Sequence, residues 1–435
     1  MNIKEFAKRR TRLMHMIGEG SIVIMPSTPV CYRNRGVEYP YRPDSDFYYL
    51  TGFPEPEAVA ILIPGRKQGE FIMFCRERDP KMEIWTGPRI GQERACSVYG
   101  ADDAFPIDDI DEILPGLLED HDKVYYTMGS NQEFDHKIMD WLNQIRQKSR
   151  AGIHTPAEFV ALDHLLHEMR LFKSAGEIKA MRRAAKISAV AHRRAMQICR
   201  PGMMEYQVEA ELIHEFMRNG ARSPAYPSIV GGGSNACVLH YTDNSAVLND
   251  GDLLLIDAGA EYEGYAADIT RTFPVNGRFN KSQAAVYEVV LAAQLAAIEK
   301  VKPGNHWNDP HDAAVRALTK GLIELGLLKG NLRELIKKEA YRRFYMHRTG
   351  HWLGMDVHDV GDYKIGNVWR LLEPGMVMTV EPGIYIPDRS KGIAKRWWNI
   401  GVRIEDDVLV TRDGYQVLSG DVPKSVKEIE TLMAG

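Results

Sequence analysis

Two apolar runs decide how this chain is interpreted: LLLIDAG at residues 253–259 and AADITRTF at residues 266–273. A short turn with a glycine joins them, so the pattern predicts two strands of an antiparallel hairpin. If the hairpin is centred on residues 261–264, Asp257 lies directly opposite Asp268, on the same face of the sheet. Two carboxylates that face each other beside apolar strands are unfavourable unless a cation or a shared proton lies between them. The alternative is that both are solvated next to the turn, but an isoleucine adjoins each of them.

A histidine-rich segment, HRTGHWLGMDVHD, occupies residues 347–359 and contains His347, His351 and His358. Two glycines bracket His351, and glycine allows the backbone to approach a site closely. A lone histidine is more often an ordinary core or surface residue. Three in so short a segment favour metal binding or proton transfer.

Two further carboxylates occur in strand-like segments. Glu381 follows an apolar strand and precedes Pro382, which cannot continue a central strand. It is either a solvated strand end or a buried carboxylate that needs a partner. Glu405 lies in an alternating strand at residues 401–410, where it shares a face with Arg403. A salt bridge between them is the plain interpretation, and it is compatible with a place in a larger site.

These positions together supply two aspartates, two glutamates and one histidine, with no thiolate. Such a hard, oxygen-rich set suits Mn²⁺ or a similar divalent ion better than a structural zinc. More than four ligands indicate two ions that share carboxylates. A metal pair ~3.5–4 Å apart can hold a bridging hydroxide and stabilise a tetrahedral intermediate, so the pattern predicts a two-metal hydrolase.

The composition is that of a globular protein, with 435 residues, 44% hydrophobic and 26% charged. This length favours two domains. The net charge of −4 gives no reason to expect nucleic acid or a membrane surface as a partner. Five cysteines without metal-type spacing, no apolar leader and no long apolar run predict a cytoplasmic protein without a disulfide framework.

The pattern of elements divides the chain into an α/β domain at residues 1–171 and a second domain at residues 172–435. Short buried strands and a helix near residues 132–149 mark the first domain. In the second, the order helix, Pro-Gly, helix, strands occurs twice, about a hundred residues apart. The repeat predicts two related halves, with a site in the crevice between them.

Five strings resemble the pita-bread metallopeptidase family, which contains methionine aminopeptidase, prolidase and aminopeptidase P. They are IDAG, DITRTF, HWLGMDVHD, TVEPG and GVRIEDD, with the ligand order Asp, Asp, His, Glu, Glu. In the first domain, EYPYRPDSDFYYLTGF at residues 38–53 and EIW at residues 83–85 look like bacterial aminopeptidase P. The resemblance covers nearly the whole chain.

The resemblance implies an α/β (α+β) fold, in which a creatinase/prolidase-like domain precedes a pita-bread domain of two related halves. The first domain would serve oligomerisation and substrate access, and the protein would form a homodimer or homotetramer. Two divalent ions per subunit, Mn²⁺ in our interpretation, would each have their own ligand set. One set would be Asp257, Asp268 and Glu405, and the other Asp268, His351, Glu381 and Glu405.

The same resemblance implies roles for further residues. Glu381 would carry the proton of the bridging water, and Arg403 would hold the region of Asp257 and Glu405. Tyr385 and Trp85 would line the substrate site. Three histidines would form hydrogen bonds to substrate or to the developing oxyanion: His240, His347 and His358. The spacer Arg348-Thr349-Gly350 departs from the more hydrophobic bacterial pattern, which bears on substrate preference and not on the chemistry.

The implied activity is metal-dependent release of the N-terminal residue from peptides whose second residue is proline. An Xaa-Pro bond is a tertiary amide with a fixed φ and no N–H, which favours a dedicated enzyme. Prolidase, which takes only Xaa-Pro dipeptides, is the nearest alternative. Methionine aminopeptidase needs no such large first domain. A metal-free binding module of the same fold is a further alternative, against which stands the presence of all five ligands.

Overall fold

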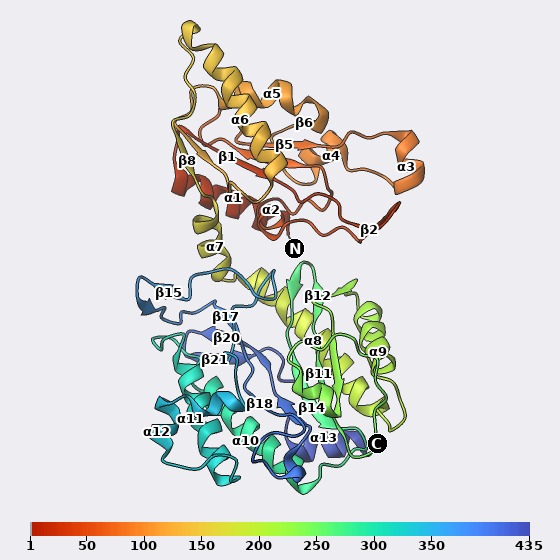
Figure 1. The fold of residues 1–435 in the computed structure, drawn as a ribbon. Coiled ribbons are helices and arrows are strands. Elements are labelled where there is room, and N and C mark those ends of the chain that lie inside the picture. Colours follow the sequence, from red (N-terminus) through yellow and green to blue (C-terminus); the bar gives the residue numbers. More distant parts are fainter. Residues whose placement is uncertain (1) are drawn as a thin grey trace. The chain divides into compact units, whose positions relative to one another are not determined.

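The computed structural model describes residues 2–435, and the chain forms two compact units, Met1–Met169 and Arg170–Gly435 (Figure 1). Each unit has its own hydrophobic core. No helix within the described residues combines the length and apolar character that crossing a membrane requires.

The first unit is built on a six-stranded mixed sheet with the order β6-β5-β4-β1-β7-β8. The central strand β1 pairs antiparallel with β4 and parallel with β7. The strands of this sheet are β1 (Ser21–Pro26), β4 (Val59–Leu62), β5 (Phe71–Cys75), β6 (Asp103–Pro106), β7 (Lys123–Tyr125) and β8 (Glu158–Val160). The remaining elements are α1 (Ile3–Ile17), β2 (Tyr32–Asn34), β3 (Val37–Glu38), α2 (Ser45–Thr51), α3 (Pro80–Thr86), α4 (Gly91–Ser97), α5 (Ile110–Leu118), α6 (Gln132–Gln147) and α7 (Asp163–Leu171).

Helices α5 and α6 pack on the sheet because each has one apolar face. The helix predicted near residues 132–149 is confirmed as α6, whose buried side chains recur at helical spacing. Its buried residues are Phe134, Ile138, Trp141, Leu142 and Ile145, and they join the core formed by β1, β4, β5 and β7.

The second unit contains four long α-helices, two short ones and several small antiparallel sheets. The long helices are α8 (Ala175–Ile198), α9 (Glu205–Arg218), α10 (Lys281–Ile298) and α11 (Asp309–Glu324), and the short ones are α12 (Leu332–Lys337) and α13 (Val426–Met433). The sheets have the orders β10-β11-β14, β13-β12-β9, β17-β20-β21, β18-β19 and β15-β16. Their strands are β9 (Ser223–Pro224), β10 (Ile229–Gly232), β11 (Leu253–Asp257), β12 (Ala260–Tyr262), β13 (Tyr265–Ala266), β14 (Thr270–Pro274), β15 (Lys364–Ile365), β16 (Val368–Trp369), β17 (Val377–Val380), β18 (Gly383–Ile386), β19 (Ile400–Arg403), β20 (Asp406–Thr411) and β21 (Gly414–Val417).

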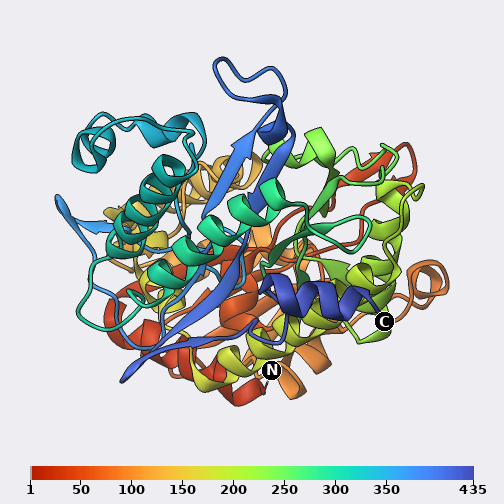
Figure 2. The same cartoon turned by 90° about the horizontal axis from the view of Figure 1, so that it is seen from below.

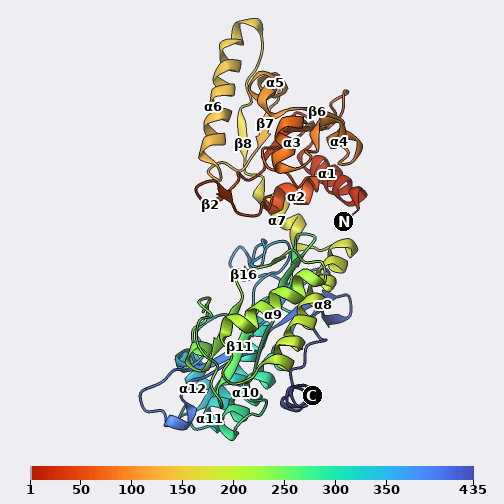
Figure 3. The ribbon, with the colours of Figure 1, turned by 90° about the vertical axis from the view of Figure 1, so that its right-hand side faces the viewer.

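The predicted repeat of helices and strands is present in this unit. The pair α8 and α9 precedes β10, β11 and β14, and the pair α10 and α11 precedes β17 to β21. Helices α8 and α9 pack side by side and lie in front of β11 in Figure 3. Helices α10 and α11 likewise pack side by side, and Figure 2 shows them on the outside of the C-terminal strands. The strands of both halves therefore lie on the inside of this unit.

The central hairpin is confirmed, but its predicted register is wrong by two residues. Asp257 pairs with Thr270 and not with Asp268, because the turn is formed by Glu263 and Gly264. Both turn residues have positive φ, 52° and 79°, as a two-residue hairpin turn requires. A shift of two residues keeps every side chain on its original face. Asp257 and Asp268 therefore still share a face, as diagonal neighbours.

The segment at residues 401–410 is two strands and not one. β19 ends at Arg403, β20 begins at Asp406, and the two strands belong to different sheets. Glu405 lies at the break between them and is only 2% exposed.

Candidate metal centre

A cavity of about 330 Å³ in the second unit collects most of the residues that the sequence singled out. All five expected metal ligands line it, together with three histidines and Arg403. Its lining residues are Leu239, His240, Asp257, Asp268, His347, Arg348, Gly350, His351, His358, Glu381, Arg403 and Glu405.

Asp257 and Asp268 are joined by a tyrosine that the sequence did not indicate. The Tyr226 hydroxyl lies 2.6 Å from Oδ1 of both carboxylates. Arg403 donates from Nη2 to Asp257 Oδ2 at 2.6 Å. The backbone N–H of Asp268 donates to Asp407 Oδ1 at 3.1 Å. Both aspartates are therefore held in fixed positions at one end of the hairpin.

His351 is oriented so that one ring nitrogen faces the carboxylates. Its Nδ1 lies 2.9 Å from the backbone oxygen of Trp352, to which it donates. Its Nε2 lies 3.3 Å from Asp268 Oδ2 and 3.8 Å from Glu381 Oε1. A carbonyl partner at one nitrogen fixes the tautomer that presents the other nitrogen to a metal ion. Gly350 packs closely against the neighbouring strand β17, since a Cβ there would lie 2.0 Å from the backbone oxygen of Thr379.

Glu405 is held by Thr270, which lies opposite Asp257 in the hairpin. The Thr270 hydroxyl donates to Glu405 Oε2 at 2.7 Å, and the Glu405 N–H donates to the Thr270 oxygen at 3.0 Å. Arg403 Nε lies 3.2 Å from the same hydroxyl. Arg403 thus contacts Asp257 directly and reaches Glu405 through Thr270.

The donor set fits divalent metal ions. Asp268, His351 and Glu405 each offer a ligand atom, and these atoms lie within 4.8 Å of one another. Burial, reinforced by the charges of Asp268 and Glu381, raises the pKa of Glu405 well above its usual range. Burial also raises the pKa of Glu381 to about 7. Buried carboxylates with this much mutual repulsion are stabilised by cations.

His347 and Arg403, which line the cavity, are linked through the hydroxyl of Tyr385. His347 Nδ1 donates to the Arg348 oxygen at 2.7 Å, and its Nε2 lies 2.8 Å from the Tyr385 hydroxyl. Arg403 Nη1 donates to that hydroxyl at 3.1 Å. Burial and the charge of Arg403 lower the pKa of His347 to about 3, so this ring is neutral. Tyr385 is 1% exposed and is not among the cavity-lining residues, and its contacts hold His347 and Arg403.

The other expected residues occupy two kinds of position. His240 and His358 are exposed at the cavity, and the ring of His358 packs edge-on against His351 with centroids 4.3 Å apart. Trp85 lies on α3 of the first unit, with 85% of its surface exposed. The structure therefore brings together the ligands and the histidines, and it leaves the role of Trp85 a prediction.

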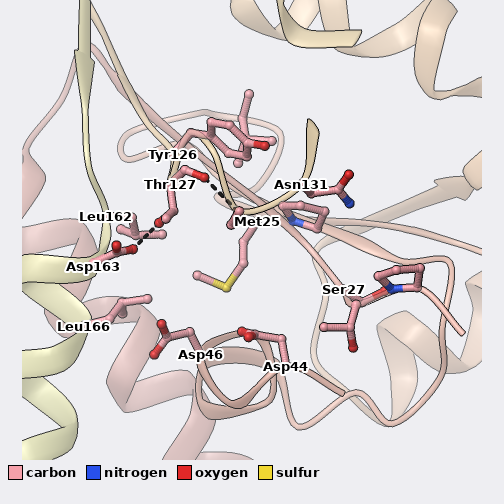
Figure 4. Close-up of a pocket in the computed structure, with 15 residues that line it drawn as sticks. Met25, Ser27, Asp44, Asp46, Tyr126, Thr127, Asn131, Leu162, Asp163 and Leu166 are labelled. Atoms are coloured by element: carbon pink, nitrogen blue, oxygen red, sulfur yellow. Dashed lines mark hydrogen bonds between the residues drawn. The ribbon is translucent and has the colours of Figure 1, made fainter. Parts of the chain in front are cut away.

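A second cavity of about 330 Å³ lies in the first unit, beside the carboxyl ends of β1 and β7 (Figure 4). Asp46, Asp163 and His167 place possible ligand atoms within 4.8 Å of one another there. Asp46 pairs with His167 at 3.3 Å, and the Thr127 hydroxyl donates to Asp163. These contacts account for the polar cluster, and we assign it no catalytic role.

An α/β unit that gathers four carboxylates and one imidazole in a cavity has the arrangement of a metal-dependent hydrolase. Comparison with known proteins agrees: residues 179–412 match metallopeptidase family M24, and residues 6–125 match the N-terminal domain of aminopeptidase P. The chain belongs to metallopeptidase family M24, within its aminopeptidase P branch. The expected fold class, an aminopeptidase P N-terminal domain followed by a pita-bread domain, is thereby confirmed.

The similarity extends over the full length. The Xaa-Pro aminopeptidase of Escherichia coli is 46% identical over 432 residues, covering 99% of this chain and 97% of that protein. A solved aminopeptidase PepP of Pseudomonas aeruginosa is 61% identical with a TM-score of 0.99, covering 100% and 98%. A proline aminopeptidase P II of Yersinia pestis is 49% identical with a TM-score of 0.97, covering 100% of both chains.

Proposed function

We propose that this protein removes the N-terminal residue from peptides whose second residue is proline, using two divalent metal ions. The observation that carries the proposal is the convergence of Asp257, Asp268, His351, Glu381 and Glu405 on one cavity. Full-length similarity to proteins named Xaa-Pro aminopeptidase supports the choice of substrate.

We assign Asp257, Asp268 and Glu405 to one ion and Asp268, His351, Glu381 and Glu405 to the other. Asp268 and Glu405 would then be shared, which agrees with their strong burial and with ligand atoms that lie within 4.8 Å of each other and of His351. Four carboxylates and one imidazole favour Mn²⁺ over a structural zinc. Bound ions would supply an activated water at neutral pH and polarise the scissile carbonyl.

The residues of the chain would handle protons and orient the peptide. Glu381 is the candidate for proton transfer because its side chain is 18% exposed, against 6% for Asp268 and 12% for Asp257. The exposed His240 and His358 are candidates for hydrogen bonds to the substrate or the oxyanion. His347 already uses both ring nitrogens, so we assign it mainly to orienting the Tyr385 and Arg403 side chains.

We also propose that the first unit serves self-association and substrate access. Ile84 and Trp85 are adjacent on α3 and are 82% and 85% exposed, the highest values among the large apolar side chains of the described residues. A homodimer or homotetramer would cover such a surface, and light scattering that gives a monomer would contradict this assignment. The five free cysteines support a reducing, cytoplasmic location.

A substrate panel tests the activity. Protein stripped with chelator is given Mn²⁺, Co²⁺ or Zn²⁺ and assayed on Arg-Pro-Pro, on an Xaa-Pro dipeptide and on a Met-Ala peptide. We expect metal-dependent release of the first residue from Arg-Pro-Pro and its loss in Asp268→Ala. Cleavage of the dipeptide alone would identify a prolidase, and cleavage of the Met-Ala peptide alone would contradict the proposal.

A further inference from the structure

Behind the metal centre, the side chain of Arg271 is completely buried and uses all five of its N–H donors. Nη1 donates to the backbone oxygens of Thr270 and Glu405, at 2.9 and 2.6 Å. Nη2 donates to Asp406 Oδ1 at 2.8 Å and to the Val422 oxygen at 3.2 Å, and Nε donates to the Pro423 oxygen at 3.1 Å. A buried guanidinium with full satisfaction fixes the backbone segments that it bridges.

Asp406 is satisfied just as completely from the other side. Its Oδ1 accepts from Arg271 and from the Ser419 hydroxyl at 2.7 Å. Its Oδ2 accepts from Gln294 Nε2 and from Lys424 Nζ, each at 2.7 Å. We call Arg271, Asp406, Ser419, Gln294 and Lys424 the Arg271 network.

The network is attached to both shared carboxylates. Glu405 directly precedes Asp406, and Arg271 donates to the backbone oxygen of Glu405. Arg271 also donates to the backbone oxygen of Thr270, and the Thr270 hydroxyl donates to the Glu405 carboxylate. Asp407 follows Asp406 and accepts the backbone N–H of Asp268. The three consecutive acidic residues therefore have different roles. Glu405 lines the cavity, Asp406 binds Arg271 at the start of β20, and Asp407 accepts the backbone N–H of Asp268.

The C-terminal segment at residues 422–424 also contacts the Arg271 network. Val422 and Pro423 accept from Arg271, and Lys424 reaches Asp406 in front of α13. Tyr287 on α10 donates to the Lys424 oxygen at 2.8 Å. Residues 422–424 are thus tied both to the Asp406 carboxylate and to α10.

We propose that the Arg271 network positions the shared carboxylates Asp268 and Glu405, so that the C-terminal segment around Lys424 is part of the metal-binding machinery. The proposal rests on the proposed two-ion function. Its residues are positioning residues, because they act through the backbone of the ligands. Loss of such outer partners lowers metal affinity by roughly 10–100-fold.

Lys424→Met tests this best, because the side chain is 23% exposed and its removal leaves the Arg271–Asp406 pair intact. Lys427→Met is the matched control, since Lys427 is exposed three residues further along the chain, on α13. Lys424→Arg, which keeps the charge, should bind Mn²⁺ with the affinity of the wild type. Calorimetric titration of the chelated full-length protein with Mn²⁺ gives stoichiometry and affinity, and urea unfolding of the same samples gives stability.

We expect Lys424→Met to bind Mn²⁺ about 10–100-fold more weakly, with KM for Arg-Pro-Pro unchanged at saturating Mn²⁺ and with Lys427→Met like the wild type. Wild-type affinity in Lys424→Met would overturn the inference, even if its stability fell. If Lys424→Met does not fold, Ser419→Ala decides by the same criterion. A wild-type protein that binds fewer than two ions would instead contradict the proposed function.

Discussion

The buried carboxylate of Asp406 directly follows the expected ligand Glu405, but Asp406 and the carboxylates of the metal centre are accommodated differently. Asp406 has two internal cations, Arg271 and Lys424, which hold the pKa of this carboxyl below its ordinary value despite its burial. The metal centre has four carboxylates and, for direct charge compensation, Arg403 and His351. The comparison teaches that Asp406 is neutralised by cations of the chain itself, whereas the four carboxylates of the centre outnumber Arg403 and His351 and favour an external cation.

The strongest way to break this comparison is to remove a shared ligand. We expect Asp268→Ala to lose metal-dependent hydrolysis of Arg-Pro-Pro, because both ions would lose a ligand. Metal content per chain, measured after gel filtration, should fall with it. The variant should still fold, since the lost group repels its neighbours. Retention of both ions and of activity would show that Asp268 is not shared.

A second test compares the unfolding of the metal-free protein. Asp406→Ala leaves Arg271 buried without its carboxylate, so we expect a loss of about 3–5 kcal/mol in unfolding free energy. Glu405→Gln replaces a carboxyl whose pKa is raised by burial and by Asp268 with a neutral group of the same shape, and it should leave the unfolding free energy equal or higher. Urea unfolding in chelator measures both. Equal destabilisation by the two substitutions would contradict the contrast.

The pH dependence sharpens the comparison further. The pKa of Glu381 is raised from 4.5 to about 7 by burial, and the pKa of His351 is raised from 6.5 to about 9 by Asp268, although burial opposes it. In both cases the folded state binds more protons than the unfolded state, so stability falls as pH rises. We expect metal-free protein to lose stability between about pH 4.5 and 9, through these two groups.

Metal ions should reverse that trend, because their binding releases those protons. Melting temperatures with chelator and with Mn²⁺, measured across this pH range, make the comparison. Asp406 provides the internal reference. Its pKa is lowered in the folded state, so the stability that it contributes is lost only when the pH falls below the ordinary pKa of an aspartate. Parallel pH curves with and without Mn²⁺ would contradict the assignment of a metal site.

The smallest effect is expected at Tyr226. Tyr226→Phe removes the hydroxyl that joins Asp257 and Asp268 but keeps the ring. We expect a loss of roughly tenfold in metal affinity or in kcat, as for other groups that orient ligands. Tyr241→Phe, whose hydroxyl bonds Glu205 at 2.8 Å, is a matched control. Equal effects of the two substitutions would remove Tyr226 from the centre.

The sequence predicted the long helices well, and it singled out five residues that line one cavity, because these signals are local. A capping box at Ser174 and Glu177 begins α8, and Pro201-Gly202 follows its end. The ligands follow from the strings that contain them and from the family resemblance.

The rest could not be predicted because it depends on contacts between distant segments. The hairpin register was missed because Glu263 adopts a positive φ, which glutamate rarely does. Tyr226 lies 31 and 42 residues from its carboxylate partners, in a loop with no motif. Arg271 and Lys424, which give Asp406 its structural role, are 135 and 18 residues from it. The alternation of residues within one strand cannot predict such distant partners.

The most direct test of the central claim is a titration of chelated protein with Mn²⁺ that follows release of the first residue from Arg-Pro-Pro. We expect no hydrolysis without metal, and activity that reaches its maximum at two ions per chain. Arg-Ala-Pro, with alanine at the second position, should be cleaved far more slowly. Undiminished hydrolysis in chelator, or equal rates on the two peptides, would contradict a two-metal Xaa-Pro aminopeptidase.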